Sequence, residues 1–335
     1  MSMQSLTKYP FDVSIVIVSL NTRDVLRESL ESVRENSHSL RVQIIVVDNN
    51  SRDGSQKMVE REFPEVLLIC SQVNLGFGGA NNLGFQSAQG RYIVLLNSDA
   101  FLTEGALERS VEHMDQNRNA GLGGGRLIGR DGLLQPSARK FPTILDDLIV
   151  RTGLAARFPH SRFFGRFDRT WADVMEAAEV DWVPGAYSII RAEVLSTVGA
   201  FDERFFLYSE EIDLCKRVKA LGHSVCYWPD IAIVHIGGES SRQMKTLELS
   251  KVGSQLTLWR MRSGLLYYRK HSGLLTTALA MMVEIFWHWL RFFRRQFSSN
   301  PERRSGAKTE LKLAGIMAQA WRETKGGKLS PEQPW

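Results

Sequence analysis

The chain has 335 residues, of which 43% are hydrophobic and 24% are charged, and this ordinary globular composition excludes a disordered or fibrous protein. The net charge of +5 is too small to indicate a nucleic-acid partner by itself, and much of the positive charge lies late, in arginines between positions 291 and 304. Three scattered cysteines without a Cys-x-x-Cys pair exclude a disulfide scaffold and a cysteine zinc site.

The first third of the sequence alternates strand and helix patterns. Each predicted strand is a short apolar run rich in β-branched residues: 13–20, 42–47, 66–69 and 92–96. The predicted helices between them are 22–35, with Thr22 as N-cap, 55–62 and 79–88. This alternation predicts an α/β fold with a mostly parallel, doubly wound sheet flanked by helices.

The pattern is looser from Gly121 to Trp171, where the glycines at 121–125 indicate turns and a basic, aromatic segment follows. Strand character returns at 180–191 and 224–227, with a helix predicted at 210–221. We expect a first domain of residues 1–241 and a helical extension of residues 242–335. The first apolar run is too short for a signal peptide, so we expect the protein in the cytoplasm.

Polar residues follow three of the predicted strands. Asn21 follows the first strand, Asp48 to Asn50 follow the second, and Asn97 to Asp99 follow the fourth. Open α/β sheets bind ligands beyond the carboxyl ends of their strands, so these residues predict one polar binding rim. The alternative is that they only cap the helices that come next.

The sequence lacks the usual nucleotide-binding loops and the nucleophile motif of hydrolases. The segment Gly76–Asn81 lacks the third glycine of a dinucleotide-binding loop and follows the third strand rather than the first. A phosphate-binding P-loop is excluded because Lys328 is followed by Leu329, and the sequence has no Gly-x-Ser-x-Gly elbow.

An acidic set remains. Asp99 at a strand end could bind a divalent cation that bridges phosphate oxygens. Glu210, Glu211 and Asp213 cluster at a predicted helix N-terminus behind aromatic residues, where a carboxylate can be desolvated and tuned as a base; the alternative is pairing with the helix dipole. His235 ends an apolar run, and a lone histidine is more often structural than a ligand.

Six stretches carry a family resemblance over roughly the first 240 residues: Val13–Asn21, Ile44–Gly54 (IIVVDNNSRDG), Asn74–Phe85 (NLGFGGANNLGF), Tyr92–Ala100 (YIVLLNSDA), Asp131–Pro142 (DGLLQPSARKFP) and Asp181–Ser241. In these stretches the chain resembles glycosyltransferase family 2, with the GT-A-type nucleotide-sugar fold. Within that family it is most similar to the rhamnosyltransferase-like branch of bacterial surface-polysaccharide synthesis. Several linked motifs in the right order make the resemblance specific.

The resemblance implies a nucleotide-sugar site and a metal site. The residues implied for the base and ribose are Leu20, Asn21, Asp48 and Asn50, and those for the nucleotide edge are Asn74, Gly76 and Ala80. Asn97-Ser98-Asp99 stands in place of the family's Asp-x-Asp motif and would contact the nucleotide sugar. Since Asn97 replaces the first acid, Asp99 with His235 would bind Mg²⁺ or Mn²⁺.

The resemblance also implies the catalytic and sugar-binding residues. Glu211 takes the position of the catalytic base, which in the family is commonly Asp, and Glu210 is the alternative because Glu211 is one methylene longer. The acceptor or donor sugar would lie at Trp182, Gly185 and Ala186, although Trp182 could instead belong to the core.

The implied reaction is an inverting, metal-dependent transfer of a sugar, expected to be L-rhamnose from dTDP-rhamnose, to a lipid-linked or oligosaccharide acceptor. The alternative within enzymes is a UDP-hexose donor, and outside enzymes a catalytically silent scaffold of a polysaccharide assembly complex. No nucleic-acid partner is expected.

Residues 274–297 predict an amphipathic helix. Its apolar stripe is Leu275, Leu279, Met282, Phe286, Trp289 and Phe293, and its polar stripe is Thr277, Glu284, His288, Arg291 and Arg295. The part before the first arginine would be about 26 Å long, short for a membrane span, and contains Glu284. We therefore expect a peripheral protein at the inner face of the cell membrane. The alternative is packing on the first domain or on a second subunit of a homodimer.

Overall fold

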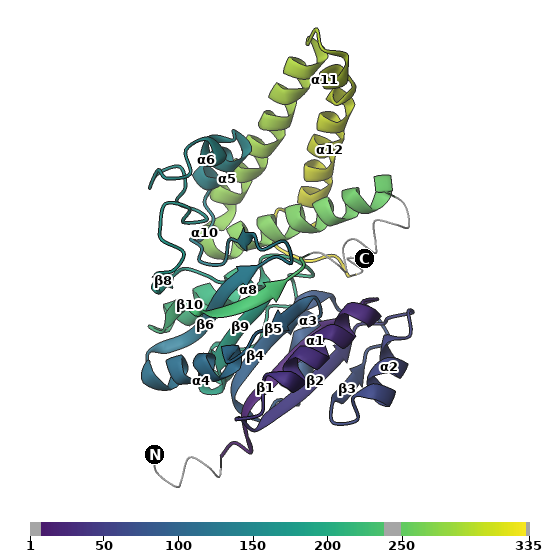
Figure 1. Cartoon of the computed structure of the whole chain (residues 1–335). Coiled ribbons are helices and arrows are strands. Elements are labelled where there is room, and N and C mark those ends of the chain that lie inside the picture. Colours follow the sequence, from purple (N-terminus) through teal and green to yellow (C-terminus); the bar gives the residue numbers. More distant parts are fainter. Residues whose placement is uncertain (1–7, 238–248, 333–335) are drawn as a thin grey trace. The chain divides into compact units, whose positions relative to one another are not determined.

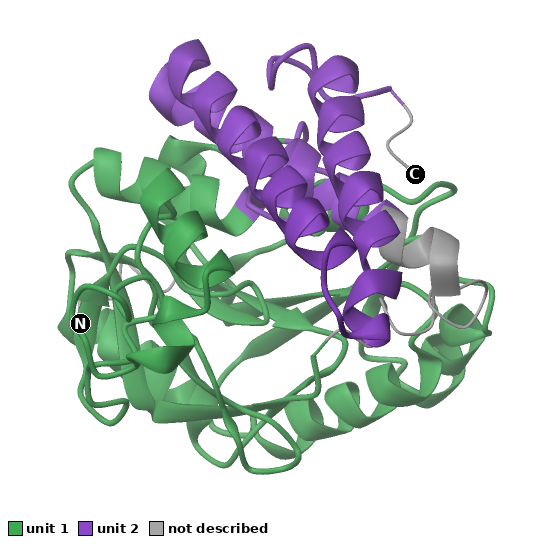
Figure 2. Cartoon of the chain, turned by 90° about the horizontal axis from the view of Figure 1, so that it is seen from above, with its two compact units in different colours: residues 1–202, 211–242 green, residues 203–210, 243–335 purple. Residues whose placement is uncertain are grey.

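The structure is a computed structural model that describes residues 8–237 and 249–332. It divides into two compact units, coloured separately in Figure 2: a sheet unit of residues 1–202 and 211–242, and a helical unit of residues 203–210 and 243–335. Each unit is described by itself below.

The sheet unit contains ten strands among its described residues: β1 (Phe11–Ser19), β2 (Val42–Asp48), β3 (Leu67–Cys70), β4 (Gly90–Asn97), β5 (Ala100–Leu102), β6 (Ala120–Ile128), β7 (Leu134–Gln135), β8 (Ala178–Val180), β9 (Tyr187–Arg191) and β10 (Ser224–His235). Its helices are α1 (Arg23–Glu35), α2 (Ser55–Glu62), α3 (Gly76–Phe85), α4 (Ala106–Gln116), α5 (Ile144–Arg151), α6 (Leu154–Arg157) and α7 (Ala192–Val198). Helix α8 (Glu210–Ala220) begins at the last residue of the short segment assigned to the helical unit.

The strands form one sheet in the order β3-β2-β1-β4-β9-β6-β10-β5, with β7 beside β6 and β8 beside β10 (Figure 1). Strands β3, β2, β1 and β4 run parallel, as does β6 with β10, whereas β9 lies antiparallel between β4 and β6. The predicted α/β fold with flanking helices is confirmed, and the four strands predicted in the first third are all present. The sheet is mixed because β5, β7, β8 and β9 all pair antiparallel with their neighbours.

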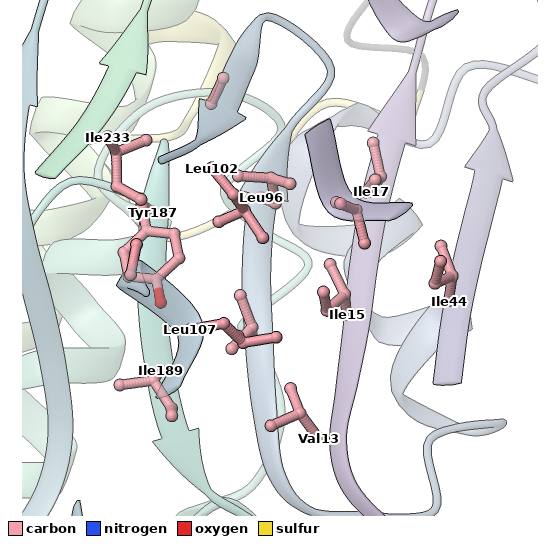
Figure 3. Close-up of a cluster of buried hydrophobic side chains, with 14 of the residues drawn as sticks. Val13, Ile15, Ile17, Ile44, Leu96, Leu102, Leu107, Tyr187, Ile189 and Ile233 are labelled. Carbon is pink, nitrogen blue, oxygen red and sulfur yellow. The ribbon is translucent and has the colours of Figure 1, made fainter. Parts of the chain in front are cut away.

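Helices cover both faces because strand side chains alternate. On β1, the side chains of Val13, Ile15 and Ile17 lie in the main core cluster with Leu26 and Leu30 of α1, as Figure 3 shows for the strand residues. The intervening Val16 points to the other face, where a Cβ on Gly84 of α3 would come within 2.5 Å of it. Because β1 is buried on both faces, successive residues along it are apolar, which explains the continuous apolar run in the sequence.

One local prediction is wrong, and another, Thr22 as the N-cap of α1, is confirmed in position only. The glycines at 121–125 do not form a turn but the middle of strand β6. A Cβ on Gly123 would lie 1.9 Å from Cζ3 of Trp228, and one on Gly124 would lie 2.8 Å from Cβ of Val183, so these glycines leave room for neighbouring side chains. Thr22 precedes α1 but makes no side-chain capping bond.

The helical unit is built on α10 (Leu249–Gln296), α11 (Pro301–Ser305) and α12 (Ala307–Glu323). Helix α10 bends at Gly273, whose φ of 81° is outside the helical region, and the arm after the bend runs beside α12 (Figure 1). A small core joins α10 and α12: Leu258, Met261, Leu265, Ile316, Met317 and Ala320.

The arm of α10 after Gly273 turns its polar stripe inward. Glu284 and His288 are buried, and His288 Nδ1 lies 2.8 Å from Oε2 of the buried Glu310 on α12. Arg291 Nε lies 3.1 Å from Oε1 of the same carboxylate, so the buried charge is compensated. The apolar stripe is exposed, with Leu275 87% and Phe286 68% accessible, along with Leu279, Met282, Trp289 and Phe293. This polarity is the reverse of an ordinary surface helix.

Candidate active site

The polar residues predicted at three strand ends come together at one edge of the sheet. Ser19 of β1 is in register with Asp48 of β2, and Val18 is in register with Asn97 of β4. The segments that follow these strands are therefore neighbours. A buried chain of hydroxyls crosses the edge: Thr22 Oγ1 donates to Ser98 Oγ and lies 3.0 Å from Ser19 Oγ. The side chain of Thr22 thus joins the ends of β1 and β4 instead of capping α1.

Asp48 is the most enclosed carboxylate of this edge, with 1% of its surface accessible. Its Oδ1 accepts hydrogen bonds from Ser51 N (2.9 Å) and Gln56 Nε2 (2.7 Å). Its Oδ2 is buried and has no hydrogen-bond partner among the described residues. A buried acceptor without a donor is costly, so Oδ2 is suited to an N–H or O–H group of a ligand. Asn21 and Asn50, on either side, have left-handed backbones with φ of 52° and 72°.

The loop before α3 is held by Asn49. The side chain of Asn49 accepts from Leu75 N (2.8 Å) and donates to Asn74 Oδ1 (2.9 Å), which also accepts from Gly76 N. Asn74 is half-buried, as is Leu20 at the end of β1, so both keep accessible surface at this edge. Ala80, predicted to line the nucleotide edge with them, is wholly buried, and its methyl group therefore packs inside the unit.

Asp99 and His235 face one another where β5 pairs with β10. His235 is in register with Ala100, and its Nε2 lies 3.4 Å from Asp99 Oδ1. Its Nδ1 lies 2.7 Å from Gln135 Oε1, and because an amide oxygen can only accept, Nδ1 carries the proton. Nε2 is buried and makes no hydrogen bond to any described residue, so it is left with a lone pair.

This pair fits a divalent cation with two protein ligands. Within residues 8–237 and 249–332 no group of three or more His, Cys, Asp or Glu side chains is arranged to hold an ion. Mg²⁺ in nucleotide sites is commonly bound through one or two carboxylates plus substrate phosphates and water. Two protein ligands are therefore enough for a cation whose other ligands come from the substrate phosphates and water. Asn97, in place of the first acid, offers a neutral amide oxygen instead of a carboxylate, and its backbone N–H donates to Ala186 O (3.0 Å).

Glu211 lies in the first turn of α8. Its Oε2 is buried and has no hydrogen-bond partner among the described residues. Burial raises the pKa of the Glu211 carboxyl above its ordinary value, and the positive charge of Arg139 partly opposes this shift. Glu210 is also buried. Asp213, the third acid of the cluster, is paired with Arg217 (2.8 Å) and thus belongs to the packing of α8.

The backbone that leads into α8 is strained. Tyr208 and Ser209 both adopt left-handed φ values, 73° and 71°, which residues other than glycine rarely do. Strain of this kind is concentrated at functional sites, where surrounding structure maintains it.

Trp182 is buried and makes structural contacts with neighbouring residues. It is 4% accessible, and its Nε1 donates to Lys140 O (2.8 Å). The guanidinium of Arg139 lies 4.8 Å from its ring centroid and donates through Nε to Asp168 Oδ1 (2.6 Å). These contacts favour the core interpretation of Trp182. Gly185 lies against Phe77 of α3, where a Cβ would come within 3.0 Å of the ring.

Gln135 and Arg139 are site residues that sequence reasoning missed. Both fall in the stretch Asp131–Pro142 that carried the resemblance, but neither follows a periodic pattern. Their partners are distant in sequence, since Gln135 and His235 are 100 residues apart. Only that stretch of resemblance could have signalled them.

Comparison with known proteins relates the chain to glycosyltransferases. Residues 14–172 match the family described as Glycosyl transferase family 2. The N-acetylglucosaminyl-diphospho-decaprenol L-rhamnosyltransferase of Mycobacterium tuberculosis is 28% identical over 210 residues, which are 58% of this chain and 66%, just under two thirds, of that protein. Rhamnosyltransferase WbbL of Escherichia coli K12 is 26% identical over 243 residues, 69% of this chain and 85% of that protein.

Two solved structures share the fold. The mannosyltransferase PcManGT from Pyrobaculum calidifontis, in complex with GDP-Man and Mn²⁺, aligns with a TM-score of 0.51 at 13% identity, covering 92% of this chain and 87% of that one. GalNAc-T7 with UDP, GalNAc and Mn²⁺ aligns with a TM-score of 0.53 at 14% identity, covering 95% and 58%. At these identities the likeness concerns the fold alone.

Proposed function

We propose that this protein, whose residues 14–172 match glycosyl transferase family 2 and which is similar to two rhamnosyltransferases, transfers a sugar from a nucleotide donor to an acceptor hydroxyl with inversion. The observation that supports this best is a set of buried atoms with free lone pairs: Asp48 Oδ2, His235 Nε2 and Glu211 Oε2. Each lacks a hydrogen-bond partner among the described residues. We assign Asp48 Oδ2 to the nucleoside, His235 Nε2 to a cation and Glu211 Oε2 to the proton of the acceptor hydroxyl.

The reaction follows from these atoms. Glu211 Oε2 accepts the proton of the acceptor hydroxyl, and the resulting oxygen attacks the anomeric carbon of the donor sugar. The new carbon–oxygen bond forms as the bond to the diphosphate breaks on the opposite face, so one displacement inverts the configuration. Asp48 holds the nucleoside in place. Asp99 and His235 would hold Mg²⁺ or Mn²⁺, which supplies charge neutralisation for the departing diphosphate.

The donor we propose is dTDP-rhamnose, and the acceptor is an N-acetylglucosaminyl diphospho-lipid or a related oligosaccharide. The names of the two rhamnosyltransferase relatives support the sugar, and the name of the mycobacterial relative supports the lipid diphosphate. A UDP-hexose donor is the second candidate. A silent scaffold would be favoured only by Asn97, which replaces the first acid of the metal motif.

A thermal-shift screen tests the nucleotide site without an acceptor. A ligand present at 100 times its Kd stabilises the folded protein by about 2.7 kcal/mol. We expect dTDP and dTDP-rhamnose with Mn²⁺ to raise Tm more than UDP or GDP sugars. Stabilisation by a UDP sugar alone would move the assignment to the second candidate. No stabilisation by any nucleotide, with no donor hydrolysis, would favour the scaffold.

We also propose that the helical unit binds an anionic membrane surface. The apolar stripe of α10 is exposed while its polar stripe is buried against α12, and large exposed apolar patches mark interaction sites. Exposed basic residues accompany the stripe: Arg294, Arg303, Arg304 and Lys308. Apolar burial and attraction of these cations to anionic lipid would act together.

A surface position is preferred to a span. Among the described residues one helix, Gln255–Gln296, is long and apolar enough to cross a membrane by length and composition. However, the arm after Gly273 runs beside α12, whose Lys308 and Arg322 are exposed. A spanning arm would carry these charges into hydrocarbon, which is costly. A membrane-surface position at the inner face of the cell membrane would bring the enzyme to a lipid-linked acceptor.

Vesicle flotation tests this position. Serine at Phe286, Trp289 and Phe293 removes apolar burial of roughly 1 kcal/mol per half-exposed ring, so binding to phosphatidylglycerol vesicles should weaken about a hundredfold. Transfer to a soluble acceptor should be unchanged. The matched control places serine at three exposed apolar residues of the sheet unit: Leu133, Val150 and Phe158. If the wild type does not bind vesicles but dimerises through the apolar stripe, the stripe is a homodimer interface instead.

A further inference from the structure

A cavity of about 230 Å³ lies in the sheet unit, apart from the strand ends that carry Asp48 and Asn97. Its walls are the segments 134–138 and 168–176, together with Arg126 of β6 and Tyr227 of β10. In the sheet, β9 separates β6 from β4, so the cavity is on the other side of β9 from the nucleotide edge. The function proposed above does not yet use it.

Two lining residues of the cavity connect it to residues of the candidate active site. Gln135 lines it and also binds the His235 ring, with 2.7 Å between Oε1 and Nδ1. On another wall Asp168 accepts a hydrogen bond of 2.6 Å from Arg139 Nε. Arg139 is the cation whose charge acts on Glu211. The cavity wall is therefore linked through Gln135 to a proposed cation ligand and through Asp168 and Arg139 to the proposed base.

The lining has the chemistry of a sugar subsite. Part of the lining is apolar, which suits the C–H face of a pyranose ring: Leu134, Pro136, Ala138, Ala172 and Val174. Two guanidinium groups supply donors. The Nε atoms of Arg126 and Arg169 are both buried and lack a hydrogen-bond partner among the described residues, so each is suited to a hydroxyl or carbonyl oxygen.

Two further features point to a single sugar. Arg169 has a left-handed backbone with φ of 52°, a conformation that arginine rarely adopts and that is typical of ligand sites. The volume of 230 Å³ is below the roughly 300–1,000 Å³ of pockets for drug-sized ligands. This volume suits a small ligand such as one sugar ring.

We propose that this cavity binds a sugar ring of the acceptor, with Arg126 and Arg169 donating to its oxygens. This inference rests on the proposed function and deepens it by assigning the acceptor subsite. The cavity would hold the acceptor so that its hydroxyl faces Glu211, while the donor enters from the nucleotide edge. Discrimination between acceptors would then depend on the walls of the cavity rather than on the residues around Asp48.

The test compares acceptor kinetics with donor kinetics in three variants. Arg169→Ala removes a donor, Ala172→Phe fills the cavity, and Arg157→Ala, at an exposed arginine that does not line it, is the matched control. The assays are transfer from dTDP-rhamnose to N-acetylglucosaminyl diphosphate carrying a short alkyl chain, and dTDP-rhamnose hydrolysis without acceptor. If dTDP-rhamnose is not the donor, the nucleotide sugar that most raises Tm replaces it.

Arg169→Ala should raise the KM for the acceptor about tenfold or more, since a hydrogen bond from a charged group contributes at least that factor. Ala172→Phe should raise the same KM at least as much, because its ring would occupy the space of the sugar. The donor KM and hydrolysis rate should stay within about twofold of wild type, and Arg157→Ala should change neither. If Ala172→Phe does not fold, Ala172→Leu takes its place. An unchanged acceptor KM in variants of an active enzyme would overturn the subsite. A wild type that neither hydrolyses donor nor transfers sugar would instead overturn the proposed function, and the subsite with it.

Discussion

Replacing Glu211 with glutamine should abolish most of the activity while leaving the fold intact. Glutamine keeps the length of the side chain but accepts no proton. A general base contributes about 10²–10⁴-fold to the rate, which corresponds to about 2.7–5.4 kcal/mol of activation free energy. We therefore expect kcat to fall at least about a hundredfold. The donor KM should hardly change, because Glu211 is not among the residues proposed to hold the nucleotide.

The same substitution should stabilise the protein at neutral pH. Burial raises the pKa of Glu211 above 4.5, so the folded protein binds this proton more tightly than the unfolded chain does. The free energy of unfolding of the wild type therefore falls as pH rises through the folded-state pKa. Glutamine does not titrate, so the variant should have the higher Tm at pH 7. The difference should shrink as pH falls toward about 4.5, the unfolded-state value, and vanish below it.

Two measurements check this prediction together: steady-state transfer with dTDP-rhamnose, and thermal unfolding between pH 4 and pH 8. Glu210→Gln is the control and should reduce turnover less. If Glu210→Gln were the more damaging change, the base would be Glu210. If both variants kept turnover within about tenfold of wild type, below the usual range for a general base, the proposed mechanism would be wrong.

Three further predictions concern the cation, the pH profile and the sheet. Asp99→Ala should remove the Mn²⁺-dependent rise in Tm with nucleoside diphosphate and abolish metal-dependent transfer; near-native turnover in Mg²⁺ would refute the assignment. Arg139→Gln should move the acidic limb of the kcat profile to higher pH, because Arg139 lowers the pKa of Glu211; a stationary limb would contradict this link. Gly123→Ala should lower the free energy of unfolding by about 1–3 kcal/mol in urea, because its Cβ would lie 1.9 Å from Trp228; unchanged stability would show that the space is not filled.

The parallel half of the sheet could be predicted because its signals are local. Strands β1 and β2 are β-branched runs buried on both faces, and each is followed by a helix with its own apolar stripe. Strand β6 could not be predicted in the same way. Its glycines indicate turns locally, but the side chain of Trp228, about a hundred residues later, occupies the space beside Gly123 and makes glycine necessary in a strand.

The site shows the same division. Asp48 and Asp99 could be found because they end strands, and strand ends of a parallel sheet meet at one edge. Gln135 could not, because its role depends on the ring of His235, which only the folded sheet brings near. In the C-terminal region the two stripes of α10 were predictable from periodicity. Which stripe faces inward depends on Glu310 of α12, which pairs with His288.

The most direct test of the central claim is the anomeric configuration of the product. The protein would be incubated with dTDP-rhamnose, Mn²⁺ and the alkyl N-acetylglucosaminyl diphosphate, and the new linkage examined by NMR. A single displacement driven by Glu211 predicts a linkage of configuration opposite to that of the donor. A product that retains the donor configuration would require a different course of reaction and would contradict the account.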